Sequence, residues 1–227
     1  MESVTPILEF KNTCVSYTKQ TMAVKYVSAA IEKNTITAIM GPSGCGKSTL
    51  LNILGLLDNL TEGQYVLAGE DVSKMKESER TRLRKGRIGF VFQSFNLIDE
   101  LTVEENVDLQ LKYLDVPKAE RKERVLDILR RVNMSHRAKH YPQQLSGGQQ
   151  QRVTIARAIV GHPKMILADE PTGNLDSKNG KEIMELLKEL NQEGTTVVMV
   201  THSNRDAAYA LRTINMLDGA VVNELAI

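Results

Sequence analysis

The stretch "ITAIMGPSGCGKST", residues 36–49, decides the fold of this 227-residue chain. The mostly apolar run 36–40 predicts a strand that is buried on both faces. It leads into the phosphate-binding pattern G-x-x-x-x-G-K-[ST], and the apolar run 47–57 that follows predicts a buried helix. A strand, a glycine-rich loop and a helix in this order predict a P-loop nucleotide-binding core, whereas a glycine-rich turn of no consequence would not need these flanks.

The loop residues have the chemistry that a phosphate group requires. Glycines allow backbone N–H groups to surround a β-phosphate, and the helix N-terminus adds the positive end of its dipole. Lys47 would reach the β- and γ-phosphates, and the Ser48 hydroxyl would ligate Mg²⁺. We predict Cys45 to be a small loop residue rather than a redox centre, because a P-loop uses its backbone there. The predicted nucleotide-binding residues are Gly41, Pro42, Ser43, Gly44, Cys45, Gly46, Lys47, Ser48 and Thr49.

Two further apolar runs end abruptly in polar residues, "PKMILADE" at 163–170 and "TTVVMVTH" at 195–202. Both are typical of buried strands in a parallel sheet. Between them, apolar residues follow helical spacing and Gly194 closes the helix. These apolar residues are Ile183, Leu186, Leu187 and Leu190. The chain is therefore predicted to be an α/β protein with a mainly parallel sheet.

The polar ends of these two strands supply candidates for metal binding and catalysis. Asp169 would hold the Mg²⁺ shell, and Glu170 is placed to act as a general base that polarises a water molecule for attack on the γ-phosphate. The alternative for Glu170 is that it only caps the loop before Pro171. His202 could contact the γ-phosphate, although an isolated histidine can also be purely structural.

The rest of the chain divides into a helical lobe and a C-terminal hairpin. Residues 96–158 show helical patterns and no strand pattern, and their segment 118–132 is amphipathic through Val125, Ile128, Leu129 and Val132. We therefore expect an inserted helical lobe. In "INMLDGAVVNEL", residues 214–225, Asp218-Gly219 lies between two alternating runs, which is a strong hairpin signal.

The composition excludes several classes of protein. With 29 basic and 28 acidic residues, the formal net charge is +1, and nothing demands a polyanionic partner such as nucleic acid. Two cysteines without CxxC spacing argue against a disulfide framework or a zinc site. No apolar run approaches the roughly 20 residues of a membrane span. The start, residues 1–10, lacks the pattern of a signal peptide. We expect a soluble protein of the reducing cytosol.

Two runs of mixed charge, residues 74–87 and 118–131, have a more general interpretation. Acidic and basic side chains at helical spacing usually form a solvated helix face. The alternative is a surface that lies near anionic lipid headgroups.

The stretch "LSGGQQQRVTIARA", residues 145–158, predicts a second anion-binding helix terminus. Ser146 is a good N-cap, Gly147 and Gly148 expose backbone N–H groups, and Gln149 is expected to begin the helix. A single ATP molecule cannot easily occupy this terminus and the P-loop of the same chain.

Taken together, these motifs resemble the ATP-binding cassette (ABC) family over essentially the whole chain. The resemblance rests on "LSGGQ", "GPSGCGKST", Gln93, "MILADE", "NLD" at 174–176 and His202. It implies one domain, 1–227, whose nucleotide-binding core with a small antiparallel β subdomain comprises 1–95 and 159–227, while 96–158 form the helical signature subdomain. It also implies a head-to-tail homodimer that closes on ATP and Mg²⁺. Ser146, Gly147, Gly148 and Gln149 would then bind ATP in trans.

The resemblance assigns further residues by position. Tyr17 would stack on adenine, Gln93 would join Ser48 and Asp169 around Mg²⁺ and sense the transport partner, and Asp176 would communicate across the dimer. The catalytic residues would be Glu170, His202 and Lys47. Tyr17 could instead be ordinary strand packing, and Gln93 an amide at a strand end.

Within the family, four segments are most similar to the ATPases of macrolide-exporter (MacB), lipoprotein-release (LolD) and cell-division (FtsE) type. These segments are 90–98, 101–107, 145–159 and 168–177. The resemblance implies an ATPase at the cytoplasmic face of the cell membrane that powers a separately encoded permease subunit. The alternative is an ATP-driven clamp on nucleic acid or the ribosome, but such relatives carry long coiled coils or two cassettes, which this chain lacks. A non-hydrolysing binder would lack the base, yet Glu170 is present.

Overall fold

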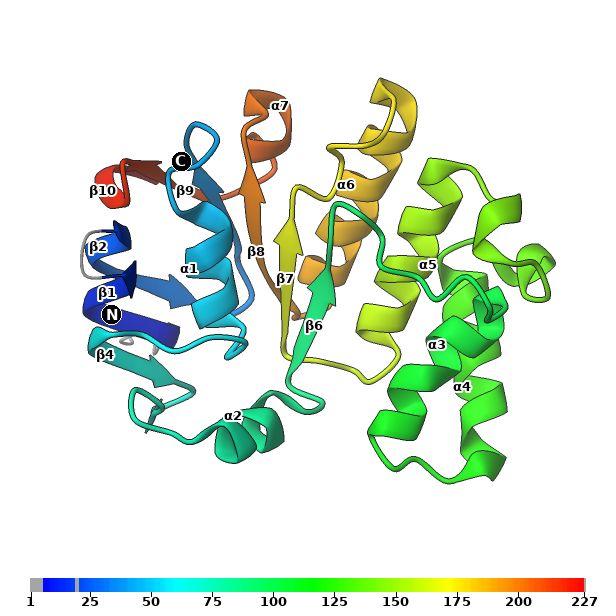
Figure 1. Cartoon of the computed structure of the whole chain (residues 1–227). Coiled ribbons are helices and arrows are strands. Elements are labelled where there is room, and N and C mark those ends of the chain that lie inside the picture. The colour runs from blue at the N-terminus through cyan, green and yellow to red at the C-terminus, as the bar shows by residue number, and fades with distance from the viewer. Residues whose placement is uncertain (1–5, 19–20, 227) are drawn as a thin grey trace.

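A six-stranded, mainly parallel sheet forms the centre of the computed structural model, which describes residues 6–18 and 21–226 (Figure 1). The strand order is β10-β9-β3-β8-β7-β6, and every neighbouring pair is parallel except β9 and β10. The expectation about a signal peptide falls partly on residues 1–5, outside the described residues. The strands are β3 Ile36–Met40, β6 Ile88–Val91, β7 Met165–Asp169, β8 Thr196–Thr201, β9 Arg212–Leu217 and β10 Ala220–Ala226.

Both faces of this sheet are covered. In β3, Ile36 and Ala38 belong to the core beneath the helical half of the molecule, while Ile39 belongs to the core on the opposite face. The same alternation places Val197 and Val198 of β8 in different cores. The predicted strands at 36–40, 163–170 and 195–202 are thus confirmed as buried on both sides, as expected for a parallel sheet flanked by other layers.

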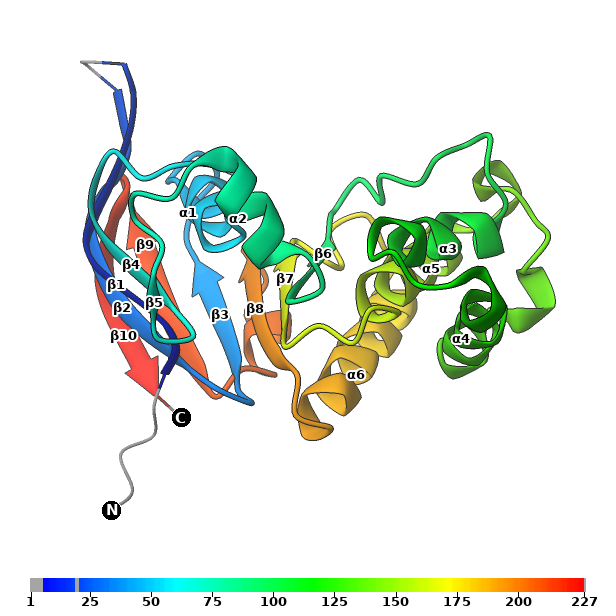
Figure 2. The same ribbon diagram turned by 90° about the horizontal axis from the view of Figure 1, so that it is seen from below.

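A second, antiparallel sheet of four strands lies beside the first (Figure 2). Its order is β2-β1-β4-β5, and helix α1, Lys47–Leu54, shares one hydrophobic core with strands of both sheets. The predicted α/β fold class, with a small antiparallel β subdomain, is confirmed. The strands are β1 Pro6–Thr18, β2 Thr21–Glu32, β4 Glu62–Leu67 and β5 Glu70–Asp71.

Helix α1 is shorter than the apolar run 47–57 predicts. After Leu54 the chain turns, because Leu56 adopts a left-handed φ of +57°. Its N–H donates to the carbonyl of Ile53, and the N–H of Leu57 donates to that of Asn52. This is the Schellman pattern of helix termination. It occurs here without glycine at the left-handed position, so the residue types did not signal it.

The helical lobe contains α3 Val103–Tyr113, α4 Lys118–Arg131 and α5 Gly147–Ile159, with 3₁₀ turns at Ser135–Arg137 and Pro142–Gln144. As the amphipathic pattern predicts, Val125, Ile128 and Leu129 of α4 are buried. Two ion pairs connect the lobe to helix α6, Ser177–Gln192, and to its C-cap. Arg152 lies 2.7 Å from Glu182 of the helix, and Arg131 pairs with the C-cap residue Glu193. The domain boundaries themselves stay a prediction.

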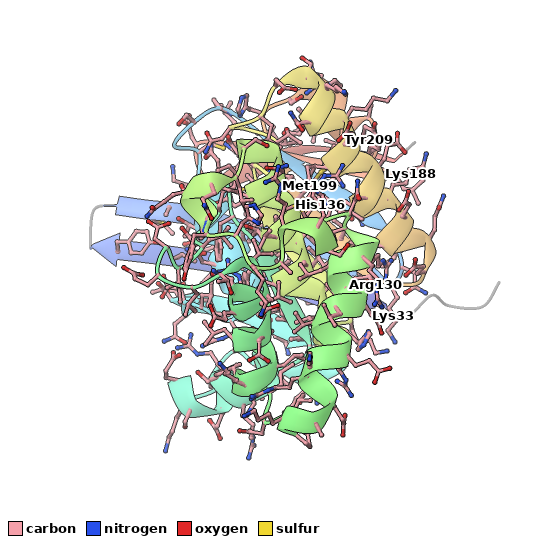
Figure 3. The ribbon with its side chains drawn as sticks, turned by 90° about the vertical axis from the view of Figure 1, so that its right-hand side faces the viewer. Lys33, Arg130, His136, Lys188, Met199 and Tyr209 are labelled. Atoms are coloured by element: carbon pink, nitrogen blue, oxygen red, sulfur yellow. The ribbon has the colours of Figure 1, made fainter. Side chains whose placement is uncertain are left out.

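Helix α6 is the crossover that the sequence predicts between β7 and β8. Its buried residues include Ile183, Leu186, Leu187 and Leu190, and Gly194 follows with a φ of +97°. A short helix α7, Asn204–Ala207, follows β8. Figure 3 shows Tyr209 beside α6 on the side that also carries Lys188. The Tyr209 hydroxyl donates to Glu185, 3.0 Å away, which attaches the segment after α7 to α6.

The predicted hairpin is present between β9 and β10. Asp218 and Gly219 have φ values of +49° and +85°, as in the two-residue turns that fit twisted strands. Gly219 also joins separate parts of the fold. Its N–H donates to the carbonyl of Cys45 at 3.1 Å, and its carbonyl accepts from the N–H of Lys25 at 2.7 Å. The hairpin turn therefore contacts both the P-loop and the antiparallel sheet.

The charged run 74–87 is only partly a solvated face. It forms helix α2, Glu77–Arg84, in which Leu83 joins a hydrophobic core and Arg80 is buried. The Arg80 guanidinium pairs with Glu77. A buried arginine is unusual, and alternation of charge alone does not reveal it.

Among the described residues, none of the helices has the length and apolar character needed to cross a lipid bilayer.

Candidate nucleotide-binding and catalytic site

The order of the parallel strands brings the predicted site residues together. Strands β3, β8, β7 and β6 are successive neighbours. Their carboxyl ends therefore meet at one edge of the sheet, where open α/β sheets bind ligands. The P-loop follows β3, and His202 follows β8. Asp169 ends β7 and Glu170 is the next residue, while Gln93 follows β6.

The P-loop connects β3 to α1 and is packed from behind. Gly46 has a φ of +96°, and a Cβ atom there would lie 2.1 Å from the carbonyl oxygen of Ala23. Only glycine permits this approach. Lys47 is buried, and its Nζ donates to the carbonyls of Gly41 and Pro42 at 3.0 and 2.8 Å. The lysine amine therefore lies against the loop that the sequence assigns to phosphate.

The other loop residues divide by exposure. Pro42, Ser43 and Gly44 are exposed, while Cys45 is a buried free thiol. Its Sγ lies 4.0 Å from Lys47 Nζ. The only other cysteine, Cys14, is also free. Cys45 thus packs as a small residue, in keeping with the interpretation preferred from the sequence.

Tyr17 lies next to the start of α1. Its hydroxyl donates to Thr49 Oγ1 at 3.3 Å, and 59% of the residue is exposed. A tyrosine used only for strand packing would be largely buried, so the alternative that the sequence left open fits poorly. Its ring is free to stack on a planar group beside the P-loop.

Ser48 and Asp169 form the centre of the predicted metal site. The Ser48 hydroxyl donates to Asp169 Oδ1 at 3.2 Å. Burial raises the pKa of the Asp169 carboxyl and the nearby Glu170 charge raises it further, while the Ser48 hydrogen bond acts in the opposite direction. Paired hard oxygen ligands suit Mg²⁺, which takes one or two protein groups and completes its shell with phosphate and water. The donor set therefore fits this ion.

Gln93 approaches the same region from the segment after β6. Its backbone carbonyl accepts from Asn174 Nδ2 at 2.9 Å. A Cβ atom placed on Gly173 would lie 2.7 Å from Gln93 Nε2 and 3.2 Å from Glu170 Oε2. Gln93 and Glu170 therefore both contact Gly173, whose lack of a side chain leaves them room.

Glu170 and His202 are paired. His202 Nδ1 lies 3.0 Å from Glu170 Oε1. Glu170 has a φ of +44°, unusual for a residue with a side chain, and its N–H donates to the carbonyl of Val200. Strained backbone of this kind is concentrated at functional sites. The carboxylate faces His202 rather than acting as a cap for the loop before Pro171.

The predicted second anion-binding terminus is the start of α5. The helix begins at Gly147, two residues before the expected start at Gln149. Ser146 is the N-cap: its Oγ accepts from the Gln149 N–H, and Gln149 Oε1 accepts from the Ser146 N–H at 3.0 Å. This is a capping box. Ser146 is exposed and Gly147 half-buried at this end of the helix, whereas Gly148 is buried.

Asp176 is the N-cap of α6. Its carboxylate accepts from the N–H groups of Lys178 and Asn179, both at 2.9 Å, and from the Asn179 side chain at 2.6 Å. The backbone hydrogen bond from Asn179 is the main reason why the pKa of Asp176 is lowered. A Cβ atom on Gly148 would lie 2.3 Å from Asn179 Oδ1. The starts of α5 and α6 are thus in direct contact.

Several polar residues in this region were missed by sequence reasoning. Gln151 of α5 donates to the carbonyl of Pro171 at 2.7 Å, and Thr172 donates to the buried Asp206. A signal did exist for Gln151. It lies on the stripe of α5 that contains the buried residues Gly148 and Ile155, so the helical period predicts a buried amide there.

Comparison with known proteins places this geometry in one family. The family model described as ABC transporter matches residues 24–173. The chain is 48% identical to the uncharacterized ABC transporter ATP-binding protein MJ1508 of Methanocaldococcus jannaschii, over 95% of this chain and 98% of that protein. It is 45% identical to the macrolide export ATP-binding/permease protein MacB of Brucella melitensis, over 96% of this chain. The chain spans only about a third of the length of that MacB protein, 34%.

Solved structures with a similar fold come from the same family. The dimeric post-hydrolysis structure of the ATP-binding cassette MJ0796, bound to ADP and Pi, superimposes with a TM-score of 0.89 at 44% identity, over 96% of this chain and 98% of that one. The similarity of fold, the match to the family model and the shared sequence agree with the motifs. The chain therefore belongs to the ABC transporter family, as an ATP-binding cassette that hydrolyses ATP with Mg²⁺ as cofactor.

Proposed function

We propose that this chain is the ATPase subunit that drives a membrane permease of the macrolide-export or lipoprotein-release type. The observation that carries the proposal is the convergence of Lys47, Asp169, Glu170 and His202 at the carboxyl ends of three adjacent strands. Each has a separate task in phosphoryl transfer, which requires positioning and charge stabilisation more than covalent chemistry.

The ground-state contacts come from the P-loop and its neighbours. Lys47 would move its ammonium group from the loop carbonyls to the β- and γ-phosphates of ATP. Ser48, Asp169 and Gln93 would hold Mg²⁺, which neutralises phosphate charge when bound. The remaining loop residues would contribute backbone N–H groups, and Tyr17 would stack on adenine. The 3.3 Å contact between Tyr17 and Thr49 supports this placement.

The chemical step needs a base and a group that keeps the base in place. Glu170 would accept a proton from water as the oxygen attacks the γ-phosphorus in line with the leaving β-phosphate oxygen. His202 holds one carboxylate oxygen of Glu170 and would donate to the γ-phosphate. Since Gln93 and Glu170 both lie against Gly173, a movement of Gln93 would reach the base through this glycine.

We infer that the active form is a head-to-tail homodimer. The γ-phosphate of ATP held by one copy would be bound by four residues of the other copy, Ser146, Gly147, Gly148 and Gln149. Asp176 would communicate the nucleotide state of one site to the other site across the dimer. The capped and exposed start of α5 supports this, as does the dimer described for the MJ0796 cassette. The contact between Gly148 and Asn179 links the trans-acting helix to the Asp176 turn.

A groove between the β core and the helical lobe is the proposed docking surface for the permease. It has a volume of about 380 Å³ and is bordered by Leu57, Phe90, Phe92, Tyr113 and Arg157. Phe90 and Phe92 stack with centroids 5.8 Å apart, and Arg157 donates to the carbonyl of Phe95, close to Gln93. A short amphipathic helix of a membrane protein would bury its apolar face here.

The relatives support an ATPase at the cytoplasmic face of the membrane that works with a separate permease. The name of MacB gives both an ATP-binding and a permease function, and this chain spans about a third of that protein, 34%. MJ1508, which is covered to 98%, has the length of a cassette alone. Both are named as transporter proteins, which disfavours the alternative of a clamp on nucleic acid or the ribosome.

The test is capture of the partner from the native membrane. The tagged chain should purify with one integral membrane protein and should hydrolyse ATP. Phe92→Asp should remove that protein but leave the ATPase rate of the isolated chain within about twofold, because the change lies in the groove. Recovery of nucleic acid or ribosomes instead, unaffected by Phe92→Asp, would contradict the proposal.

A further inference from the structure

The turn that follows Glu170 is held by the helix that begins with the signature motif. Gln151 Nε2 donates to the carbonyl oxygen of Pro171 at 2.7 Å, across 20 residues of sequence. Gln151 is completely buried, at 0% exposure. The bond therefore lies in the interior, where water does not compete for it and a hydrogen bond is strongest.

Packing alone does not explain a glutamine at this position. While Nε2 is paired, Gln151 Oε1 is buried and has no hydrogen-bond partner within residues 6–18 and 21–226. An unsatisfied buried carbonyl is destabilising, and an apolar side chain of similar volume would avoid it. The hydrogen bond that the amide N–H donates to Pro171 therefore has a function that offsets this destabilisation.

The use is evident from the backbone of Glu170. This residue precedes a proline and has a φ of +44°, a conformation that persists only where several contacts enforce it. On one side, the Glu170 N–H donates to Val200 and its carboxylate pairs with His202. On the other side, Gln151 holds the carbonyl of Pro171, the very next residue.

We propose that Gln151 is a positioning residue for Glu170, through which the placement of α5 controls the orientation of the base. The proposal rests on the roles inferred above for Glu170 and for the start of α5. Residues 146–149 would contact one ATP molecule, and Gln151, in the next turn of the same helix, holds the base that acts on the other. A small displacement of α5 thus changes the orientation of the Glu170 carboxylate, although the two nucleotides do not contact each other.

The first test is Gln151→Met, which keeps the length of the side chain and removes the donor. The matched control is Gln150→Met, because Gln150 donates instead to the carbonyl of Leu145 at the start of its own helix. Gln151→Met should lower kcat about tenfold, the effect of a slightly misplaced catalytic group, and change KM for ATP less than about twofold. Gln150→Met should leave both values within about twofold.

The second test separates positioning from general loss of structure. Because Gln151 acts through Glu170, adding Gln151→Met to a Glu170→Gln chain should cause no further loss in a single-turnover assay. A second full loss in the double variant would overturn the proposal, as would a kcat for Gln151→Met equal to that of the control. If Gln151→Met does not fold, Gln151→Asn keeps the amide but is one methylene too short, and the same results are required of it.

Different results would refute the catalytic role of Glu170 and the positioning role of Gln151. A Glu170→Gln chain that hydrolyses ATP at the parent rate would refute the proposed catalytic base itself. If Glu170→Gln is inactive but Gln151→Met and Gln151→Asn match the control, only the positioning role is refuted.

Discussion

His202 Nδ1 lies 3.0 Å from Glu170 Oε1, although 32 residues separate the two in sequence. The pair exists because β7 and β8 are parallel neighbours, so residues just beyond their ends are adjacent. An imidazole in this position restrains the carboxylate.

Glu170→Gln should abolish most hydrolysis while ATP binding survives. The amide keeps the shape but cannot accept a proton from water, and loss of a general base costs about 10²- to 10⁴-fold in rate. Closed dimers should then accumulate with ATP, since they normally reopen after hydrolysis. Sedimentation with and without ATP measures this. Glu189→Gln, an exposed residue of α6, is the control. A Glu170→Gln chain that stays monomeric at saturating ATP would contradict the sandwich mechanism.

His202→Ala should lower kcat by about 10- to 100-fold, because both the restraint on Glu170 and a γ-phosphate contact disappear. The effect should be mostly on kcat, since Lys47 and the loop still bind the nucleotide. Steady-state ATPase kinetics provide the measurement, with His162→Ala as the control at an exposed histidine. Equal kinetics for the two alanine variants would show that the pair has no catalytic role.

Lys47→Ala should weaken nucleotide binding or hydrolysis by about a hundredfold or more, because the only ammonium group within the P-loop is removed. The variant should still fold, since the contacts of Lys47 Nζ within residues 6–18 and 21–226 are to its own loop, namely the carbonyls of Gly41 and Pro42 and the Cys45 thiol. Binding of a fluorescent ATP analogue and turnover should both be measured. Unchanged turnover would refute the P-loop assignment.

Ser146→Arg should block the second anion-binding terminus while ATP binding by the monomer persists. The bulky side chain also removes the N-cap of α5, which alone costs about 1 kcal/mol of stability. Ser146→Asp separates the two effects, because aspartate is a good N-cap yet repels a phosphate. Both variants should bind ATP as monomers and lose closure and turnover. Normal activity in Ser146→Asp would argue against the action of α5 in trans.

Asp169→Asn should raise the stability of the nucleotide-free protein at neutral pH while abolishing Mg²⁺-dependent turnover. Burial raises the pKa of the Asp169 carboxyl above its ordinary 3.8, so the folded chain binds this proton more tightly than the unfolded chain does. Ionisation therefore costs folding stability as the pH rises from 3.8 through the raised pKa. Across that pH range, the melting temperature of the asparagine variant should rise relative to that of the parent. At higher pH, the variant should keep the higher melting temperature. An asparagine variant less stable than its parent at neutral pH would contradict this.

The parts of the structure that could be predicted are those in which neighbouring residues determine the outcome. Strand β3, the P-loop and α1 follow one another without interruption, and the β7-α6-β8 crossover has clear apolar periods. The hairpin turn is determined by Asp218 and Gly219. Because parallel strands align their carboxyl ends, these local elements already placed Asp169, Glu170 and His202 near Lys47.

What could not be predicted depends on contacts between distant segments. The hydrogen bond from Gln151 to Pro171 requires α5 to lie against the turn that follows β7, and no sequence pattern in either segment indicates this contact. The contact of Tyr17 with Thr49 requires the antiparallel sheet to dock beside α1, so no local pattern predicted it. The family resemblance assigned Tyr17 only a stacking role on adenine. The early end of α1 depends on Leu56 adopting a left-handed conformation, which leucine rarely does.

The hairpin turn at Gly219 has a consequence for synthesis. Its N–H bonds to the carbonyl of Cys45, and its own carbonyl bonds to Lys25. The ribosome must therefore add 174 residues after Cys45 (219 minus 45) before the group that braces the phosphate loop exists. A nascent chain released or stalled before this point has the complete P-loop motif without its support. Such a chain should bind ATP more weakly than the complete cassette does.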